Sequence, residues 1–89
     1  MKLEYTEKFK RSFKKLSPEV QTGFATQLKK FLANHNSPYH PSLRIKKIQG
    51  TDRIFEFTVT MGIRMTFEFT EQGILLRNIG EQNLTLKKP

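Results

Sequence analysis

The sequence of 89 residues contains no cysteine, so neither a disulfide nor a thiolate metal site can stabilise its fold. It also has no apolar run that approaches the ~20 residues needed to span a bilayer. Its first residues, MKLEYTEKF, lack the apolar stretch of a signal peptide. These absences predict a cytoplasmic protein without a membrane partner, whose core depends on close packing of its eight phenylalanines.

Histidine is scarce as well, and both histidines, His35 and His40, fall in the turn-rich segment 34–42. Neither has carboxylate or histidine neighbours at the spacing that metal ligands require. No paired-carboxylate motif and no Ser/His/Asp pattern occurs elsewhere in the sequence. We therefore expect neither a metal site nor a cofactor.

Acidic residues are few relative to basic ones. Sixteen Lys and Arg residues stand against eight Asp and Glu residues, which gives a net charge of +8 at pH 7. A charge of this size favours an acidic partner, with nucleic acid first, an acidic protein second and an anionic membrane surface third. The alternative is that the excess lysine only keeps the protein soluble.

The length allows one domain, residues 1–89, in which segment 34–42 separates a helical half from a strand half. In the helical half we expect a short strand at 2–5, a first helix capped by Thr6 and a second helix that starts at Ser17 and Pro18. Apolar residues recur at helical spacing in both helices: Phe9, Phe13 and Leu16, then Val20, Phe24, Leu28, Phe31 and Leu32. Two such helices are expected to form an antiparallel hairpin packed on a sheet.

The strand half predicts a basic strand at 42–50 followed by three antiparallel strands within 54–80. Apolar side chains alternate on one face, whereas the other face carries Glu56, Thr58, Thr60, Arg64, Thr66 and Glu68. Gly62 and Gly73 are expected to supply positive φ in the hairpin turns. The predicted fold class is α+β, with an N-terminal helical hairpin on one face of a twisted, mainly antiparallel sheet and the polar face open.

Arg64 follows the first hairpin turn and is expected on the open polar face, where its forked donors match the oxygens of a phosphate. The alternative is a surface ion pair with Glu56 or Glu68. Arg44 and Lys46 are expected to point the same way along a strand and to form a positive ridge for a nucleic-acid backbone. The alternative for the ridge is a charged edge strand that resists aggregation.

Three segments in this order, HPSLRIKKIQG at 40–50, IFEFTVTMGIRMTF at 54–67 and GILLRNIG at 73–80, resemble the RelE/ParE toxin superfamily, in its RelE/YoeB-like mRNA interferase branch. The resemblance implies a toxin of a type II toxin–antitoxin system, which as a ribosome-dependent, metal-independent endoribonuclease cleaves mRNA. In this chemistry the ribose 2′-hydroxyl attacks the adjacent phosphate while side chains exchange protons and arginine stabilises charge. The implied partners are mRNA on the ribosome and a cognate antitoxin, with which the chain would form homo- or hetero-oligomers.

The resemblance also assigns roles to individual residues. Arg64 matches the family arginine that contacts the scissile phosphate, and Lys46 and Glu56 are the nearest counterparts of the proton-transfer residues. Gln82 stands where a catalytic histidine or arginine is expected. The residues expected to contact RNA are Arg44, Lys46, Lys47, His40 and Arg77.

Gln82 departs from the family pattern, because an amide cannot exchange a proton near pH 7. Loss of one acid–base group typically costs ~10²- to 10⁴-fold in rate, so Gln82 predicts an attenuated nuclease. The alternative is a non-nuclease member, either a ParE-like inhibitor of DNA gyrase or a degenerate protein that binds its antitoxin. A third interpretation is a nucleic-acid-binding domain without enzymatic activity.

Overall fold

The computed structural model describes residues 2–33 and 43–89; His35, His40 and the rest of segment 34–42 lie outside the described residues. The elements are β1 (Lys2–Tyr5), α1 (Glu7–Lys14), α2 (Pro18–Ala33), β2 (Lys46–Lys47), β3 (Phe55–Thr60), β4 (Ile63–Phe69), β5 (Gly73–Glu81) and α3 (Gln82–Lys87). The predicted α+β class is confirmed. No helix in these two ranges combines the length and hydrophobicity that a membrane crossing demands.

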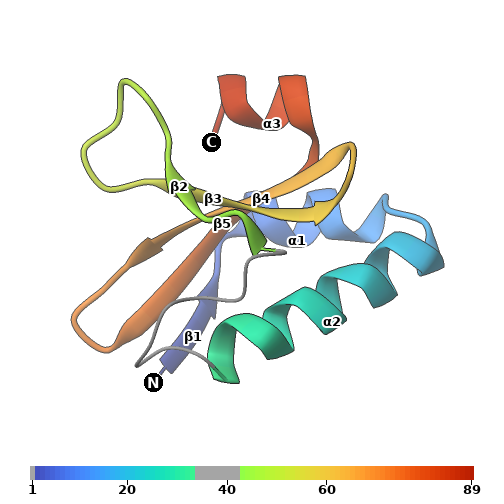
Figure 1. Ribbon diagram of the computed structural model, residues 1–89, viewed down its shortest axis with the longest axis horizontal. Coiled ribbons are helices and arrows are strands. Elements are labelled where there is room, and N and C mark those ends of the chain that lie inside the picture. The colour runs from blue at the N-terminus through green and yellow to red at the C-terminus, as the bar shows by residue number, and fades with distance from the viewer. Residues whose placement is uncertain (1, 34–42) are drawn as a thin grey trace.

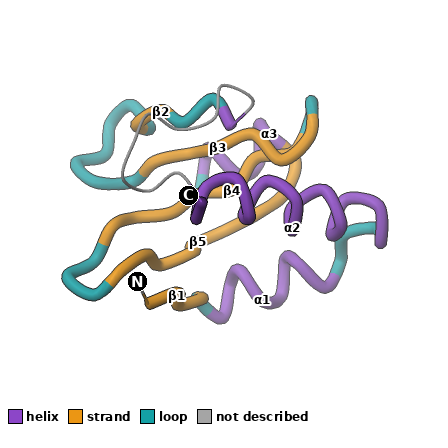
Figure 2. The backbone as a smooth tube through the Cα atoms, turned by 60° about the horizontal axis from the view of Figure 1, so that its bottom comes forward, coloured by secondary structure: helices purple, strands orange, loops and turns teal. Residues whose placement is uncertain are grey.

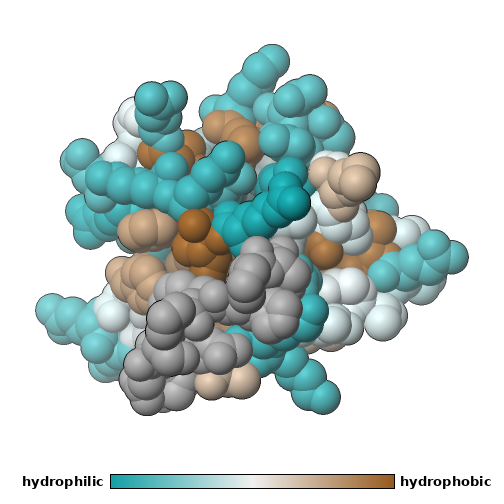
Figure 3. Space-filling view, in the orientation of Figure 1, coloured by the Kyte–Doolittle hydropathy of each residue, from teal (hydrophilic) through white to brown (hydrophobic). Residues whose placement is uncertain are grey.

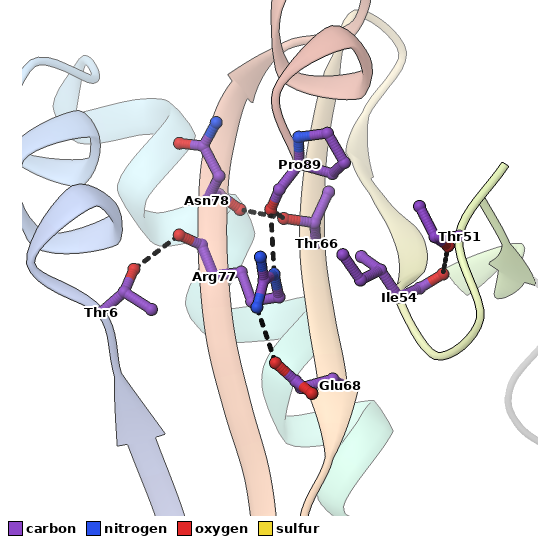
Figure 4. Close-up of polar contacts among 8 residues, drawn as sticks. All are labelled: Thr6, Thr51, Ile54, Thr66, Glu68, Arg77, Asn78 and Pro89. Carbon is purple, nitrogen blue, oxygen red and sulfur yellow. Dashed lines mark hydrogen bonds and ion pairs between the residues drawn. The ribbon is translucent and has the colours of Figure 1, made fainter. Parts of the chain in front are cut away.

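Both predicted helix starts are confirmed by capping contacts. Thr6 Oγ1 accepts a hydrogen bond from the Phe9 N–H at 3.0 Å, and Ser17 Oγ accepts one from the Val20 N–H at 3.3 Å. Such bonds satisfy backbone donors that the first turn of a helix leaves unpaired. The Thr6 hydroxyl also donates to the Arg77 carbonyl at 2.6 Å, so the start of α1 is attached to β5 (Figure 4).

The five strands form one sheet in the order β1-β5-β4-β3-β2. β1 runs parallel to β5, and the other neighbours are antiparallel, so the first and last strands of the chain lie side by side (Figure 2). The register between β4 and β5 shifts after Thr66, which leaves Arg77 as an extra residue between Leu76 and Asn78.

The predicted basic strand at 42–50 is shortened to Lys46–Lys47. Arg44 has φ 49°, a left-handed conformation that a regular strand does not contain. Arg44 and Lys46 therefore do not lie on one strand, and the ridge predicted from strand alternation is wrong in that form.

The core lies between the sheet and the first two helices, which contact each other through Phe13 of α1 and Phe24 of α2. Phe31 of α2 packs against Phe57 of β3 and Phe67 of β4, with ring centroids 5.6 and 4.9 Å apart. All three side chains are almost fully buried. The predicted helical hairpin on the apolar face is therefore confirmed.

The polar face is only partly open, because α3 lies on the side of the sheet opposite to α2 (Figure 1). The Thr66 hydroxyl donates to the Pro89 carbonyl at 2.9 Å, and Arg77 Nε donates to the same oxygen at 3.2 Å. Thr66 and Thr85 are buried as a result. The expectation of an open polar face is therefore wrong for Thr66 of β4 and for Glu56 of β3, which is 4% exposed, and it holds for the exposed Lys46 of β2.

Gly73 and Gly62 provide a matched pair for testing the approach of β1 to β5. A Cβ atom on Gly73 would overlap the backbone of Lys2, whereas one on Gly62 would have no atom within 4 Å. Neither glycine has positive φ, contrary to the expectation for both turns. The need for glycine at 73 is therefore steric.

We expect Gly73→Ala to lower the free energy of unfolding by about 2–3 kcal/mol, because β1 must move away to admit the methyl group. Gly62→Ala should change it by less than about 0.5 kcal/mol. Urea denaturation followed by circular dichroism measures both. Equal losses in the two variants would contradict the close approach of β1 to β5.

Candidate functional site

Two neighbouring rows of polar residues cross the polar face of the sheet, one from β2 to β4 and the other from β3 to β4. The register pairs Lys46 with Glu56 and Glu56 with Thr66 in one row, and Thr58 with Arg64 in the next. Residues directly opposed on adjacent antiparallel strands have Cβ atoms ~4.5–5.5 Å apart. The sheet therefore brings Lys46, Glu56 and Arg64 together, as the sequence predicted.

Arg64 is bound by its own hairpin. Its Nη1 donates to three carbonyl oxygens of the β3–β4 turn region, those of Thr60 at 2.9 Å, Met61 at 3.0 Å and Ile63 at 3.2 Å. Only 12% of the side chain is exposed. The prediction placed Arg64 on the correct face, but the expectation of an open, solvated arginine is wrong, because the chain turns back over it.

Glu56 is the charged partner of Arg64. Its Oε1 lies 3.7 Å from Arg64 Nε, and its side chain is only 5% exposed. A carboxylate removed from water to this degree is costly unless a positive charge compensates it. Arg64 and Glu56 therefore form the ion pair that was the alternative interpretation, but this pair is buried and does not lie at the surface.

Two pockets border this ion pair. One, of about 290 Å³, is lined by Arg44, Thr58, Thr60, Met61 and Arg64. The other, of about 400 Å³, is lined by Lys46, Lys47, Ile48, Gln49, Glu56 and Leu86. The first pocket has two guanidinium groups, which suit an anion such as a phosphate. The second combines the Glu56 carboxylate and two lysines with the apolar side chains of Ile48 and Leu86.

The surface around the two pockets is hydrophilic and basic. Arg44, Lys46 and Lys47 are all exposed, and hydrophilic side chains gather over β2 and the loop beside it, with hydrophobic residues in small patches between them (Figure 3). Lys46 faces Glu56 across the strands, whereas Lys47 is paired with Phe55. The side chains of the two lysines therefore leave the backbone of β2 on opposite faces of the sheet.

Gln82 lies at the margin of the site. It is the first residue of α3, and its N–H donates to the Gly62 carbonyl at 2.9 Å. This bond holds it beside the hairpin turn that encloses Arg64. The register, which pairs Arg64 with Gly80, also brings the start of α3 close to Arg64.

Arg77 is not brought to these pockets. Its Nη1 donates to Glu68 Oε1 at 2.6 Å, and its Nε donates to the Pro89 carbonyl (Figure 4). It contributes to neither pocket lining. The structure thus places Arg77 under the C-terminal segment, and its predicted RNA contact lacks support from the geometry. His40 lies outside the described residues, so its RNA contact stays a prediction.

Leu86 is a wall of the second pocket and was not among the residues that the sequence predicted for the site. A signal for α3 was present at Glu81. Its carboxylate accepts hydrogen bonds from the Asn83 N–H at 3.1 Å and the Leu84 N–H at 3.2 Å. An acidic side chain at this position favours a helix start.

The site offers charge stabilisation and proton transfer from side chains. Arg44 and Arg64 can hold an anion, and Glu56 and Lys46 lie close enough to act on one substrate. Within residues 2–33 and 43–89, no group of three or more His, Cys, Asp or Glu side chains is arranged to hold a metal ion.

The sequence matches no protein-family model and no curated protein. Its structure, however, is similar to solved toxins. A chain of the RelB–RelE antitoxin–toxin complex from Methanococcus jannaschii is 13% identical with a TM-score of 0.72, over 97% of this chain and 98% of that one. YafQ from E. coli is 15% identical with a TM-score of 0.76, over 94% and 96%.

A third similar structure is the intact E. coli RelBE toxin–antitoxin complex, at 17% identity and a TM-score of 0.66, over 89% of this chain and 93% of that one. Structural similarity at this level of sequence identity establishes the fold of the chain. The chain therefore has the RelE-like fold, and the resemblance noted in the sequence is confirmed for the fold.

We expect Arg64→Ala to lower the free energy of unfolding by about 2–4 kcal/mol, because it leaves the buried Glu56 carboxylate without its partner. Urea denaturation measures the loss. The double variant Arg64→Ala with Glu56→Gln should recover part of it, since the unpaired charge is gone. A stability unchanged by Arg64→Ala would contradict the buried pair.

Proposed function

We propose that this chain is the toxin of a type II toxin–antitoxin system and acts as a ribosome-dependent, metal-independent endoribonuclease on mRNA. The observation that carries the proposal is the juxtaposition of Arg64, Glu56 and Lys46 beside two pockets on the polar face of a RelE-like sheet. The solved structures it resembles include RelE and YafQ toxins.

Each group has a role in the proposed reaction. Glu56 takes the proton of the ribose 2′-hydroxyl, whose oxygen attacks the adjacent phosphorus. Lys46 donates a proton to the departing 5′-oxygen, which leaves a 2′,3′-cyclic phosphate and a 5′-hydroxyl. Arg44 and Arg64 bind the phosphate oxygens as charge develops. Nη2 of Arg64 has no hydrogen-bond partner in the described part of the chain, so it is available for this contact.

Gln82 slows the proposed reaction. It can orient the substrate by hydrogen bonds, but it cannot supply the proton that a histidine would. Positioning of the mRNA by the ribosome compensates in part, because orientation alone contributes substantially to rate. We therefore propose an attenuated nuclease.

An antitoxin is the proposed protein partner. The solved structures with this fold include antitoxin–toxin complexes from two organisms. A net charge of +8 suits an acidic partner as well as RNA.

The second candidate is a non-nuclease toxin, either a ParE-like inhibitor of DNA gyrase or a protein that retains only antitoxin binding. One observation favours it: Arg64 is already bound to three carbonyl oxygens and to Glu56. A substrate phosphate must compete with these contacts. Gln82 favours the same alternative.

Lys46 and Lys47 allow a matched test of the nuclease. We expect Lys46→Ala to lower mRNA cleavage by about 10²-fold or more, because it removes the proton donor. Lys47 also lines the second pocket, but it is paired with Phe55 and not with Glu56, so Lys47→Ala should lower cleavage less than about five-fold. Cleavage is measured by primer extension in a reconstituted translation system, with a control that lacks ribosomes.

Cuts that require ribosomes and Lys46 would support the proposal. Equal effects of the two lysine variants would contradict the assigned role of Lys46. Intact mRNA combined with inhibition of DNA supercoiling by gyrase would select the ParE-like alternative. Intact mRNA without gyrase inhibition would leave antitoxin binding as the function.

Arg44 can be removed without strain, because glycine tolerates its φ of 49° better than arginine does. We expect Arg44→Gly to keep the free energy of unfolding within about 1 kcal/mol of the original value and to lower cleavage about 10-fold. Arg11→Ala, which removes an exposed arginine from α1, is the control for net charge. Similar losses of cleavage in both variants would show that Arg44 acts only through overall charge.

A further inference from the structure

One polar side chain occupies a core position of α2. The buried residues of this helix are Phe24, Gln27 and Phe31, so a glutamine stands between two phenylalanines on the stripe that faces the sheet. Only 8% of Gln27 is exposed. A buried amide costs free energy unless it is hydrogen-bonded, whereas an apolar residue would fill the same place without this cost. Packing alone therefore does not explain a glutamine at this position.

Gln27 reaches the backbone of β3. Its Nε2 donates a hydrogen bond to the Thr58 carbonyl at 2.8 Å. One turn earlier in α2, a Cβ atom on Gly23 would lie 3.6 Å from Thr60 Cγ2 and 4.0 Å from the Val59 carbonyl oxygen. The backbone of α2 therefore lies directly against this end of β3, and Gln27 attaches the two elements by a polar contact.

The same end of β3 contains a β-bulge. The register pairs Thr58 with Arg64 and then Thr60 with Ile63. Val59 is therefore an extra residue on the β3 side of this pair of strands. A bulge bends its strand and redirects the backbone groups that follow it. The hydrogen bond at the Thr58 carbonyl thus holds the backbone immediately before the bulge.

The carbonyls that follow the bulge hold Arg64. Those of Thr60 and Met61 accept hydrogen bonds from Arg64 Nη1 at 2.9 and 3.0 Å. The same guanidinium borders the pocket that it shares with Arg44, where the phosphate is proposed to bind. The orientation of the guanidinium depends on where these two carbonyls point, and their direction depends on the bulge.

We propose that Gln27 is a positioning residue for Arg64. From the core side of the sheet, Gln27 fixes the bulge at Val59, and the bulge directs the Thr60 and Met61 carbonyls toward the guanidinium. Arg64 is thereby held in place on the polar face before the phosphate binds. The consequence for cleavage rests on the proposed function, whereas the order imposed on Arg64 does not depend on it.

Gln21 provides a matched control in the same helix. Its Nε2 donates to the Phe13 carbonyl at 3.0 Å, so this glutamine joins α2 to α1 and not to β3. Methionine is unbranched and flexible like glutamine and can fill the same space without an N–H donor. Gln27→Met and Gln21→Met therefore each remove one hydrogen bond between a side chain and a backbone carbonyl. Circular dichroism confirms that both variants are folded.

The first measurement is hydrogen exchange at Arg64 Nε–H, followed by NMR in the full ¹⁵N-labelled chain. The signal is assigned by its loss in Arg64→Lys. We expect Gln27→Met to speed this exchange about 10-fold, because the carbonyls around the guanidinium open more often. Gln21→Met should change it less than about two-fold, because its hydrogen bond lies elsewhere. Arg77 Nε–H, which is bonded to the Pro89 carbonyl, is the reference within the same spectrum.

The second measurement is the rate of a single round of mRNA cleavage on ribosomes. Gln27→Met should lower the rate at saturating protein about 10-fold, because Arg64 acts as charge develops on the phosphate. The protein concentration that gives half of this rate should change less than about two-fold, since Arg44 and Lys46 still bind the RNA. Gln21→Met should leave both quantities within about two-fold of the original values.

Faster exchange at Arg64 and slower cleavage in Gln27→Met alone would support the proposal. Unchanged exchange at Arg64 in that variant, or equal effects of the two methionine substitutions, would overturn it. If the original chain cleaves no mRNA, the proposed function fails, and the exchange measurement still decides whether Gln27 positions Arg64.

Discussion

The packing of Phe31 against Phe57 and Phe67 determines how the rest of the molecule is arranged. These contacts attach α2 to β3 and β4 and fix which face of the sheet is apolar. Because side chains alternate along a strand, the same contacts send Glu56, Thr58 and Arg64 to the other face. The core and the candidate site are therefore two consequences of one alternation, and a shift of one residue in register would exchange them.

Local signals predicted much of the fold. The capping residues Thr6 and Ser17 predicted the starts of two helices. Strict alternation of apolar and polar residues predicted β3 and β4. Two features that escaped prediction depend on contacts between distant residues. The extra residue Arg77 changes the register between β4 and β5, and Pro89 holds the C-terminal segment on Thr66. No short window of sequence contains both partners of such a contact.

The sequence predicted three residues of the candidate site as neighbours, but not the contacts that each of them makes. Lys46, Glu56 and Arg64 are adjacent, as the pattern of polar residues implied. The pattern of polar residues could not predict that the carbonyl oxygens of the β3–β4 hairpin enclose Arg64. The long side chain of an arginine can reach either solvent or backbone from the same strand position. Arg64 therefore combines a structural contact with an available guanidinium edge, and its removal affects both.

The pairing of β1 with β5 has a consequence for synthesis of the protein. The hydrogen bond from Thr6 to Arg77 joins residues 71 positions apart, and β5 also flanks the strand that carries Arg64. A nascent chain that ends before residue 73 has Arg64 and Glu56 but lacks the strand that joins their hairpin to α1 and β1. Contacts of such long sequence separation form late in folding. The complete sheet can therefore assemble only after β5 has left the ribosome that made it.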